Sequence, residues 1–248
     1  MCAIIGWCGE LPPKFLELAL ERAETRGRDA TGIAWRENQK TNYVKAALSA
    51  DRFVRAFSKD VKTANGATRG IAHVRRASPG MMRNDENAHP FCHSKLVYAH
   101  NGTIRNWIEL SKLRGVEVST DSMLLGYNIA ERDFSNVIGT ASLVWIDRDA
   151  VRCIRIAKEL VGANIRWACP KRGAGQFSVV ASTQPIIQSG LDYLTADATI
   201  DIQWLEIEHA NCFILEQDTI YNEGALPFNA NCFVHASADS HTSKELSK

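Results

Sequence analysis

The stretch Met1-Cys2-Ala3-Ile4-Ile5-Gly6 opens the chain and predicts a buried first strand with a cysteine at its start. It lacks the charged segment and the long apolar core of a secretory signal peptide. Removal of Met1 would leave Cys2 with both a thiol and a free α-amine. Because an α-amine titrates near about 7.7–8.0, it can act as a general base at neutral pH. Taken alone, however, Cys2 fits a buried structural cysteine better than a nucleophile.

The composition limits the classes of protein to consider. The chain has 248 residues, of which 45% are hydrophobic and 23% are charged, as expected of a globular protein with a sizeable core. A net charge of +1 gives little attraction for polyanions, so we expect neither nucleic acid nor a membrane as a partner. The seven cysteines form no Cys-x-x-Cys pair. Because the sequence opens with no secretion signal, we expect these cysteines to be reduced thiols in a cytoplasmic protein.

Apolar patterning predicts strands in both halves of the chain, with helices between them. Strands are expected over residues 2–8, 31–35, 43–48, 68–74, 96–99, 141–146, 151–156, 165–169, 177–181, 203–207, 211–216 and 219–221. Helices are expected after Pro12 and Pro13 and over residues 51–58, 106–113, 121–132 and 185–191, the fourth with Ser119 or Thr120 as N-cap. This order favours an α+β fold of two packed sheets covered by helices. Residues 2–235 would form one domain, and residues 236–248 a polar, disordered tail.

Two short segments could supply polar groups to a site around Cys2. One predicted strand ends on Arg75 and Arg76, and either guanidinium could bind the carboxylate of an amino acid through two hydrogen bonds. An exposed arginine pair is the commoner alternative. Another predicted strand ends on Asn101 and Gly102, whose amide groups are suited to a developing oxyanion. A simple Asn-Gly hairpin turn is the alternative there.

Further segments carry weaker signals. Asp121 opens a predicted helix, where its carboxylate could pair with a substrate ammonium or only compensate the helix N-terminus. The turn Arg26-Gly27-Arg28-Asp29 could close one wall of a pocket, although alone it indicates only a turn. Residues 89–93 contain two histidines and a cysteine, but Pro90 prevents a helical ligand pair and no second cluster completes a metal site.

Together and in this order, the segments resemble the glutaminase domain of the class II glutamine amidotransferases, a family of N-terminal-nucleophile hydrolases. The resemblance extends over residues 2–125 and is carried by Cys2-Ala3-Ile4-Ile5-Gly6, the stretch from Arg26 to Ala34, His73-Val74-Arg75, Asn87-Ala88-His89-Pro90, His100-Asn101-Gly102-Thr103-Ile104 and Thr120-Asp121-Ser122. Departures from the family pattern, among them Arg76, Ser78 and Met123, fall around the glutamine-binding loop.

The resemblance implies a four-layer αββα sandwich of two mainly antiparallel sheets, the N-terminal-nucleophile hydrolase fold. It implies that Cys2 attacks the side-chain amide of L-glutamine and forms a glutamyl thioester, with Asn101 and Gly102 holding the oxyanion. Arg75 would bind the α-carboxylate of the substrate and Asp121 its α-ammonium. It adds three further substrate-binding candidates, which are Ser78, Arg26 and His89. No cofactor and no metal are expected.

The glutaminase unit would occupy nearly the whole chain. We therefore expect a stand-alone amidotransferase subunit that passes ammonia to a separate synthase, and the sequence gives no sign of the acceptor. A non-catalytic alternative is a glutamine-binding sensor or assembly module with a blocked N-terminus. Steady-state release of glutamate or ammonia from glutamine separates the two hypotheses.

Overall fold

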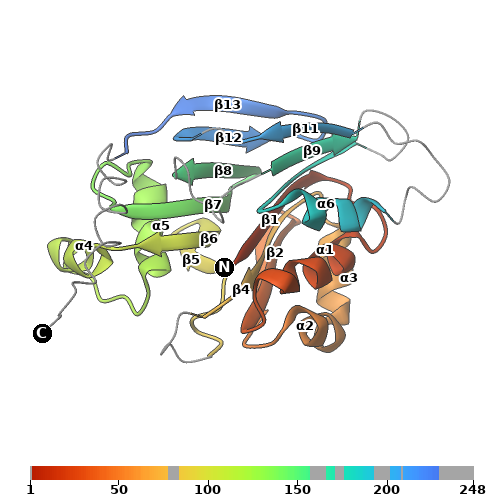
Figure 1. Ribbon diagram of the computed structural model, residues 1–248, viewed down its shortest axis with the longest axis horizontal. Coiled ribbons are helices and arrows are strands. Elements are labelled where there is room, and N and C mark those ends of the chain that lie inside the picture. The colour runs from red at the N-terminus through yellow and green to blue at the C-terminus, as the bar shows by residue number, and fades with distance from the viewer. Residues whose placement is uncertain are drawn as a thin grey trace, which may run out of the picture.

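Two antiparallel sheets stack face to face, and helices cover their outer faces (Figure 1). The computed structural model describes residues 2–77, 84–156, 166–170, 176–192, 202–207 and 209–228. The expected four layers, helices–sheet–sheet–helices, are confirmed. The predicted tail, residues 236–248, lies outside the described residues.

The first sheet has seven strands in the order β11-β9-β10-β1-β4-β2-β3. In chain order they are β1 (Ala3–Gly9), β2 (Ala30–Glu37), β3 (Lys40–Ala46), β4 (Arg69–Arg75), β9 (Arg166–Pro170), β10 (Phe177–Ala181) and β11 (Ile202–Glu206). Its outer face is covered by α1 (Phe15–Ala23), α2 (Ala50–Ala56), α3 (Ser58–Gly66) and α6 (Gln184–Leu191) (Figure 1).

The second sheet has six strands in the order β13-β12-β8-β7-β6-β5. They are β5 (Phe91–His93), β6 (Leu96–Ile104), β7 (Gly139–Asp147), β8 (Ala150–Ile156), β12 (Asn211–Leu215) and β13 (Ile220–Ala225). The helices α4 (Trp107–Arg114) and α5 (Asp121–Glu131) lie on the side of this sheet that faces away from the first (Figure 1). A short 3₁₀ turn, η1 (Glu24–Arg26), follows α1.

The alternation of side chains along β1 explains how the layers stack. Ile5 and Trp7 point into the core shared with the helices, whereas Ile4 points into the core between the two sheets. Gly6 also faces the second sheet, where a Cβ would lie only 2.5 Å from Cγ2 of Val144. The small residue therefore lets the two sheets approach closely at the central strand.

Most predicted elements are confirmed, and three differ from the prediction. The predicted helix over residues 51–58 is in fact two helices, α2 and α3, because the apolar positions continue at Val61 and Ala64. The short strand β5 was not expected at all. The strand predicted over residues 96–99 runs on to Ile104 as β6. Thr120 is the N-cap of α5, since its side chain accepts a hydrogen bond from the Met123 amide.

The six cysteines of the described residues are all free thiols. One of them, Cys212, is fully buried on β12, and its sulfur lies 3.4 Å from Oε2 of Glu223. Burial, followed by the charge of Glu223, raises the pKa of this thiol to about 12, so it stays protonated. Among the described helices none is long and apolar enough to cross a membrane.

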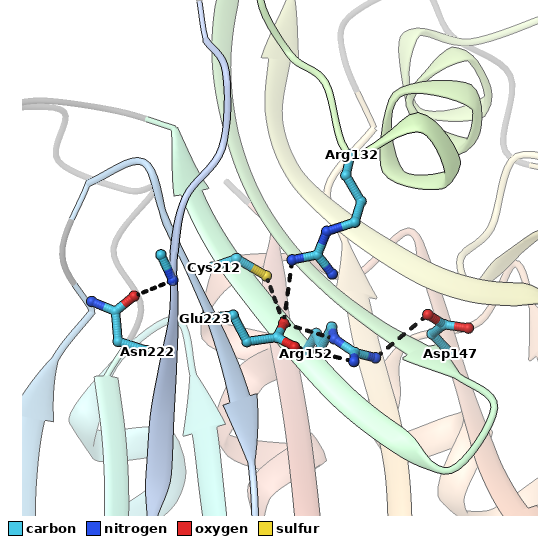
Figure 2. Close-up of polar contacts among 7 residues, drawn as sticks. Arg132, Asp147, Arg152, Cys212, Asn222 and Glu223 are labelled. Atoms are coloured by element: carbon cyan, nitrogen blue, oxygen red, sulfur yellow. Dashed lines mark hydrogen bonds and ion pairs between the residues drawn. The ribbon is translucent and has the colours of Figure 1, made fainter.

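Glu223 is the centre of a charged cluster that fastens the edge strand β13 to the second sheet (Figure 2). Its carboxylate accepts hydrogen bonds from Arg152 on β8 at 2.8 and 3.2 Å, and Arg132 approaches it at 3.5 Å. Arg152 also reaches Asp147 at 3.4 Å. Burial alone would raise the pKa of Glu223, but the hydrogen bonds and charge of Arg152 outweigh it and lower that pKa.

We predict that Glu223→Gln lowers the free energy of unfolding at pH 7 by about 1–2 kcal/mol, because it removes the charge that Arg152 and Arg132 share. A carboxyl whose pKa is lowered on folding stabilises the protein above its unfolded pKa, near about 4.3, and this contribution is lost as the pH falls through the folded value. Urea unfolding should therefore show a difference between variant and wild type at pH 7 that shrinks towards pH 3.

A suitable control is Asp149→Asn, which breaks the ion pair between Arg36 and a carboxylate that is 71% exposed. An exposed pair of this kind should contribute no more than about 0.5 kcal/mol. An equal loss in both variants, or a loss from Glu223→Gln that does not depend on pH, would contradict the stabilising role of Glu223.

Candidate active site

A small cavity of about 180 Å³ opens where strands of both sheets meet α4 and α5. Its walls come from the start of the chain, the end of β4, the segment before β5, the end of β6 and the first turns of the two helices. The lining residues are Cys2, Arg75, Arg76, Asn87, His89, His100, Gly102, Thr103, Ile104, Trp107, Thr120, Asp121 and Ser122. Pockets for drug-sized ligands usually measure about 300–1,000 Å³, so this one suits a smaller molecule.

Cys2 reaches the cavity because β1 pairs with β4. The antiparallel register places Ala3 opposite Val74, so Cys2 comes beside the end of β4. Its sulfur lies 3.4 Å from the amide nitrogen of Arg76 and 3.6 Å from the carbonyl oxygen of the same residue. The backbone of Arg76 therefore both donates to the thiol and accepts from it, a contact that no side-chain pattern in the sequence indicates.

The environment of the Cys2 thiol favours its neutral form. Burial raises the pKa of Cys2 above its ordinary value, and the Arg76 backbone hydrogen bond and the charges of Arg75 and Arg26 only partly offset this. The thiol therefore needs a base to ionise it near pH 7.

Arg26 holds the main chain of Cys2 rather than lining the cavity. Its Nε donates a hydrogen bond to the Cys2 carbonyl at 2.7 Å. In the same turn, Asp29 accepts from the Ala77 amide at 2.7 Å and donates its own amide to the Arg75 carbonyl at 3.0 Å. The turn thus braces both Cys2 and the end of β4.

Gly27 permits the turn to lie against β4. A Cβ at this position would come within 2.4 Å of the Arg75 carbonyl group, so only glycine allows the two backbones to touch.

Asn101 and Gly102 lie inside β6, opposite Ser142 and Ala141 of β7, so the alternative of an Asn-Gly hairpin turn is wrong. Gly102 has a φ of 151°, and a Cβ there would lie 2.0 Å from the Thr140 carbonyl oxygen. Glycine is therefore required on both counts. Asn101 is only 4% exposed and lies between two residues that line the cavity, without lining it itself.

Asp121 faces the cavity from the first turn of α5. Its carboxylate accepts hydrogen bonds from the Ile104 amide at 2.9 Å and the Ser122 amide at 2.8 Å. It therefore fixes the helix start against the end of β6, as expected of an acid at a helix N-terminus. With Arg75, it also gives one small cavity a cation and an anion, which suits a zwitterion.

The sequence left open whether Arg75 or Arg76 binds a substrate carboxylate, and the two residues differ in burial. The Arg75 side chain is buried at 6% exposure and faces the cavity, whereas the Arg76 residue is exposed. A buried guanidinium is the better candidate for binding a substrate carboxylate. Ser78, the neighbouring candidate, lies outside the described residues.

His89 lines the cavity with a buried ring, 4% exposed, that packs between His73 at 4.0 Å and Phe91 at 4.6 Å between centroids. Burial holds its pKa well below the usual value, so the ring is neutral. The His89–Pro90 peptide is cis, and Gly32 packs against it so closely that a Cβ would lie 2.0 Å from the His89 carbonyl oxygen.

His100 and Trp107 also line the cavity, although the sequence did not identify them as site residues. His100 lies next to the Asn-Gly pair, and its Nδ1 lies 3.0 Å from the Ser122 hydroxyl. Trp107 begins α4 just beyond the end of β6. His100 belongs to one of the motifs that carry the family resemblance, whereas Trp107 lies three residues beyond that motif.

Comparison with known proteins identifies the family of the segment that contains the cavity. The family model described as "Glutamine amidotransferases class-II" matches residues 1–124, a segment that contains every lining residue of the cavity. The glutamine–fructose-6-phosphate aminotransferase of Aquifex aeolicus is 38% identical over 140 residues, which are 53% of this chain and 23% of that protein. The chain thus matches less than a quarter of the length of this curated relative.

Solved structures support the fold. One described as the allosteric regulatory enzyme of purine biosynthesis has a TM-score of 0.71 at 20% identity, covering 90% of this chain and 49% of the other. A class II glutamine aminotransferase domain protein from Silicibacter pomeroyi has a TM-score of 0.55 at 14% identity, covering 91% and 100%. Since the family model covers half of the chain, including the whole lined cavity, the chain belongs to the class II glutamine amidotransferases.

Proposed function

We propose that this domain hydrolyses the side-chain amide of L-glutamine to glutamate and ammonia through a glutamyl thioester on Cys2. The observation that carries the proposal is the position of the Cys2 thiol at a small cavity that also presents Arg75 and Asp121. A thiol beside a cation and an anion suits an amino acid whose far end is attacked. The family of the chain supports the same substrate.

The reaction begins once Met1 has been removed. The α-amine of Cys2 takes the thiol proton, which is needed because burial disfavours the free thiolate. The sulfur attacks the amide carbon, and the N–H of Gly102, which lines the cavity, stabilises the oxyanion. The Asn101 side chain, which does not line the cavity, stays a proposed second donor. The C–N bond then breaks as the amine returns the proton to the departing ammonia. Water hydrolyses the thioester and releases glutamate.

Positioning groups complete the proposal. Arg75 binds the α-carboxylate and Asp121 the α-ammonium, so the reacting amide is held towards Cys2 without either group touching it. Arg26 orients Cys2 through its carbonyl group, and the predicted role of Arg26 in substrate binding stays a prediction. His89 and Ser78 remain proposed substrate contacts.

The fate of ammonia is a further part of the proposal. Ammonia released near pH 7 becomes protonated and loses its nucleophilicity, so an acceptor must take it from a sheltered site. We propose that a separate synthase subunit in the cytoplasm is this acceptor. The support is that the matched segment makes up only 23% of a relative that is named as an aminotransferase of fructose-6-phosphate.

We predict that Cys2→Ala and Cys2→Ser, with Met1 removed, lower glutamate release from glutamine by more than about 10⁴-fold, since the attacking sulfur is lost. A coupled assay for glutamate measures this, and circular dichroism should show an unchanged fold. Cys92→Ala is the matched control, because Cys92 is exposed and lies outside the cavity. Wild-type turnover in Cys2→Ala would refute the nucleophile, whereas glutamine binding without turnover by the trimmed wild type would favour a glutamine-binding sensor.

We predict that Arg75→Ala raises the KM for glutamine about 10–100-fold with a smaller change in kcat, since hydrogen bonds to a charged group contribute about 1.5–3 kcal/mol. Arg76→Ala should raise KM less, because the backbone of that residue, not its side chain, contacts the thiol. The reverse order of effects would show that Arg76 binds the carboxylate.

A further inference from the structure

His73 forms a hydrogen bond between the two sheets at the cavity. It lies on β4 of the first sheet with a fully buried side chain, and its Nε2 lies 3.1 Å from the His100 carbonyl oxygen on β6 of the second sheet. β4 and β6 each lead to candidate site residues, and these residues come from different sheets. Arg75 follows two residues after His73, and Asn101 follows directly after His100.

The His100 carbonyl is buried at a place where β6 has few strand neighbours. β5 pairs with β6 only from Leu96 to Tyr98, so beyond Tyr98 the described residues provide β7 alone as a partner strand. Buried backbone carbonyls require donors, and His73 supplies one at His100. Because a peptide unit is planar, fixing this oxygen also fixes the amide of Asn101.

The ring of His73 is itself held in place. His89 stacks on it at 4.0 Å between centroids with an angle of 33° between the ring planes. A carbonyl oxygen can only accept, so Nε2 carries the hydrogen and Nδ1 of the neutral ring carries none. Burial lowers the pKa of His73 to about 3, which keeps the ring neutral throughout the pH range in which the protein would work.

We propose that His73 is a positioning residue for the amidotransferase reaction. By donating its Nε2–H to the His100 carbonyl, it fixes the position of the Asn101–Gly102 segment of β6 relative to the Cys2 thiol at the start of β1 in the other sheet. It touches neither substrate nor thiol and acts only through β6. This inference rests on the proposed function, because it concerns the groups that would bind the oxyanion.

The test compares two amides of different reach. In His73→Gln, the side-chain amide extends to about the place of Nε2 and keeps the donor, whereas in His73→Asn the shorter amide reaches only the place of Nδ1. We expect His73→Asn to lower kcat for glutamine at least about tenfold with KM within about threefold, since oxyanion contacts form only in the transition state and a directly bound donor contributes about 10²–10³-fold. His73→Gln should restore kcat to within about threefold of wild type.

Val74→Ala is the matched control. Val74 lies between His73 and Arg75 on β4 and is fully buried in the core beneath the helices, so its truncation loosens the same strand without removing the donor. We expect its kcat to stay within about threefold of wild type at temperatures well below its Tm. Equal kcat values for His73→Asn and His73→Gln, or an equal loss in Val74→Ala, would overturn the proposal.

Hydrogen exchange separates this inference from the proposed function. Peptides that contain Asn101 and Gly102 should exchange at least about tenfold faster in His73→Asn than in His73→Gln or wild type, whether or not glutamine is a substrate. If the wild type releases no glutamate, the proposed function fails and this comparison still tests the role of His73. Unchanged exchange in a folded His73→Asn would refute that role.

Discussion

The antiparallel pairing of β1 with β4 is the constraint on which the rest of the site depends. It places Ala3 opposite Val74, so Cys2, which precedes Ala3, comes beside Arg75 and Arg76 at the end of β4. The backbone of Arg76 then holds the thiol of Cys2, and the Arg26 side chain holds the Cys2 carbonyl. Cys2 precedes β1 rather than lying within it, and these contacts restrict the motion of its side chain and its carbonyl group.

The second sheet supplies the opposite wall, so the site exists only while the two sheets stay stacked. Gly6 lets them approach closely, and the apolar core between them holds them together. Gly102 on β6 then faces the same cavity as Cys2, while α5 contributes Asp121. The polar bond from His73 to His100 joins the sheets where the chemistry would take place.

The sequence was sufficient for the features that depend on local patterns. Alternating apolar residues predicted the strands, and the order of the motifs, through their resemblance to the amidotransferase family, predicted that Cys2, Arg75, Gly102 and Asp121 belong to one site. Contacts through the backbone could not be predicted in this way, because any side chain at Arg76 would give the same contact. The length of β6 was also missed, because Asn and Gly usually end strands, whereas here Gly102 is required by its φ and by the nearby Thr140 carbonyl.

The central claim is that the trimmed chain begins with a cysteine that attacks the end of a glutamine side chain. Incubation with the electrophilic analogue 6-diazo-5-oxo-L-norleucine, followed by intact-mass and peptide mass spectrometry, tests it most directly. The account predicts one adduct per chain, located on Cys2 and only in molecules that lack Met1, with protection by excess L-glutamine. Labelling of another cysteine, or no labelling of correctly trimmed protein, would contradict it.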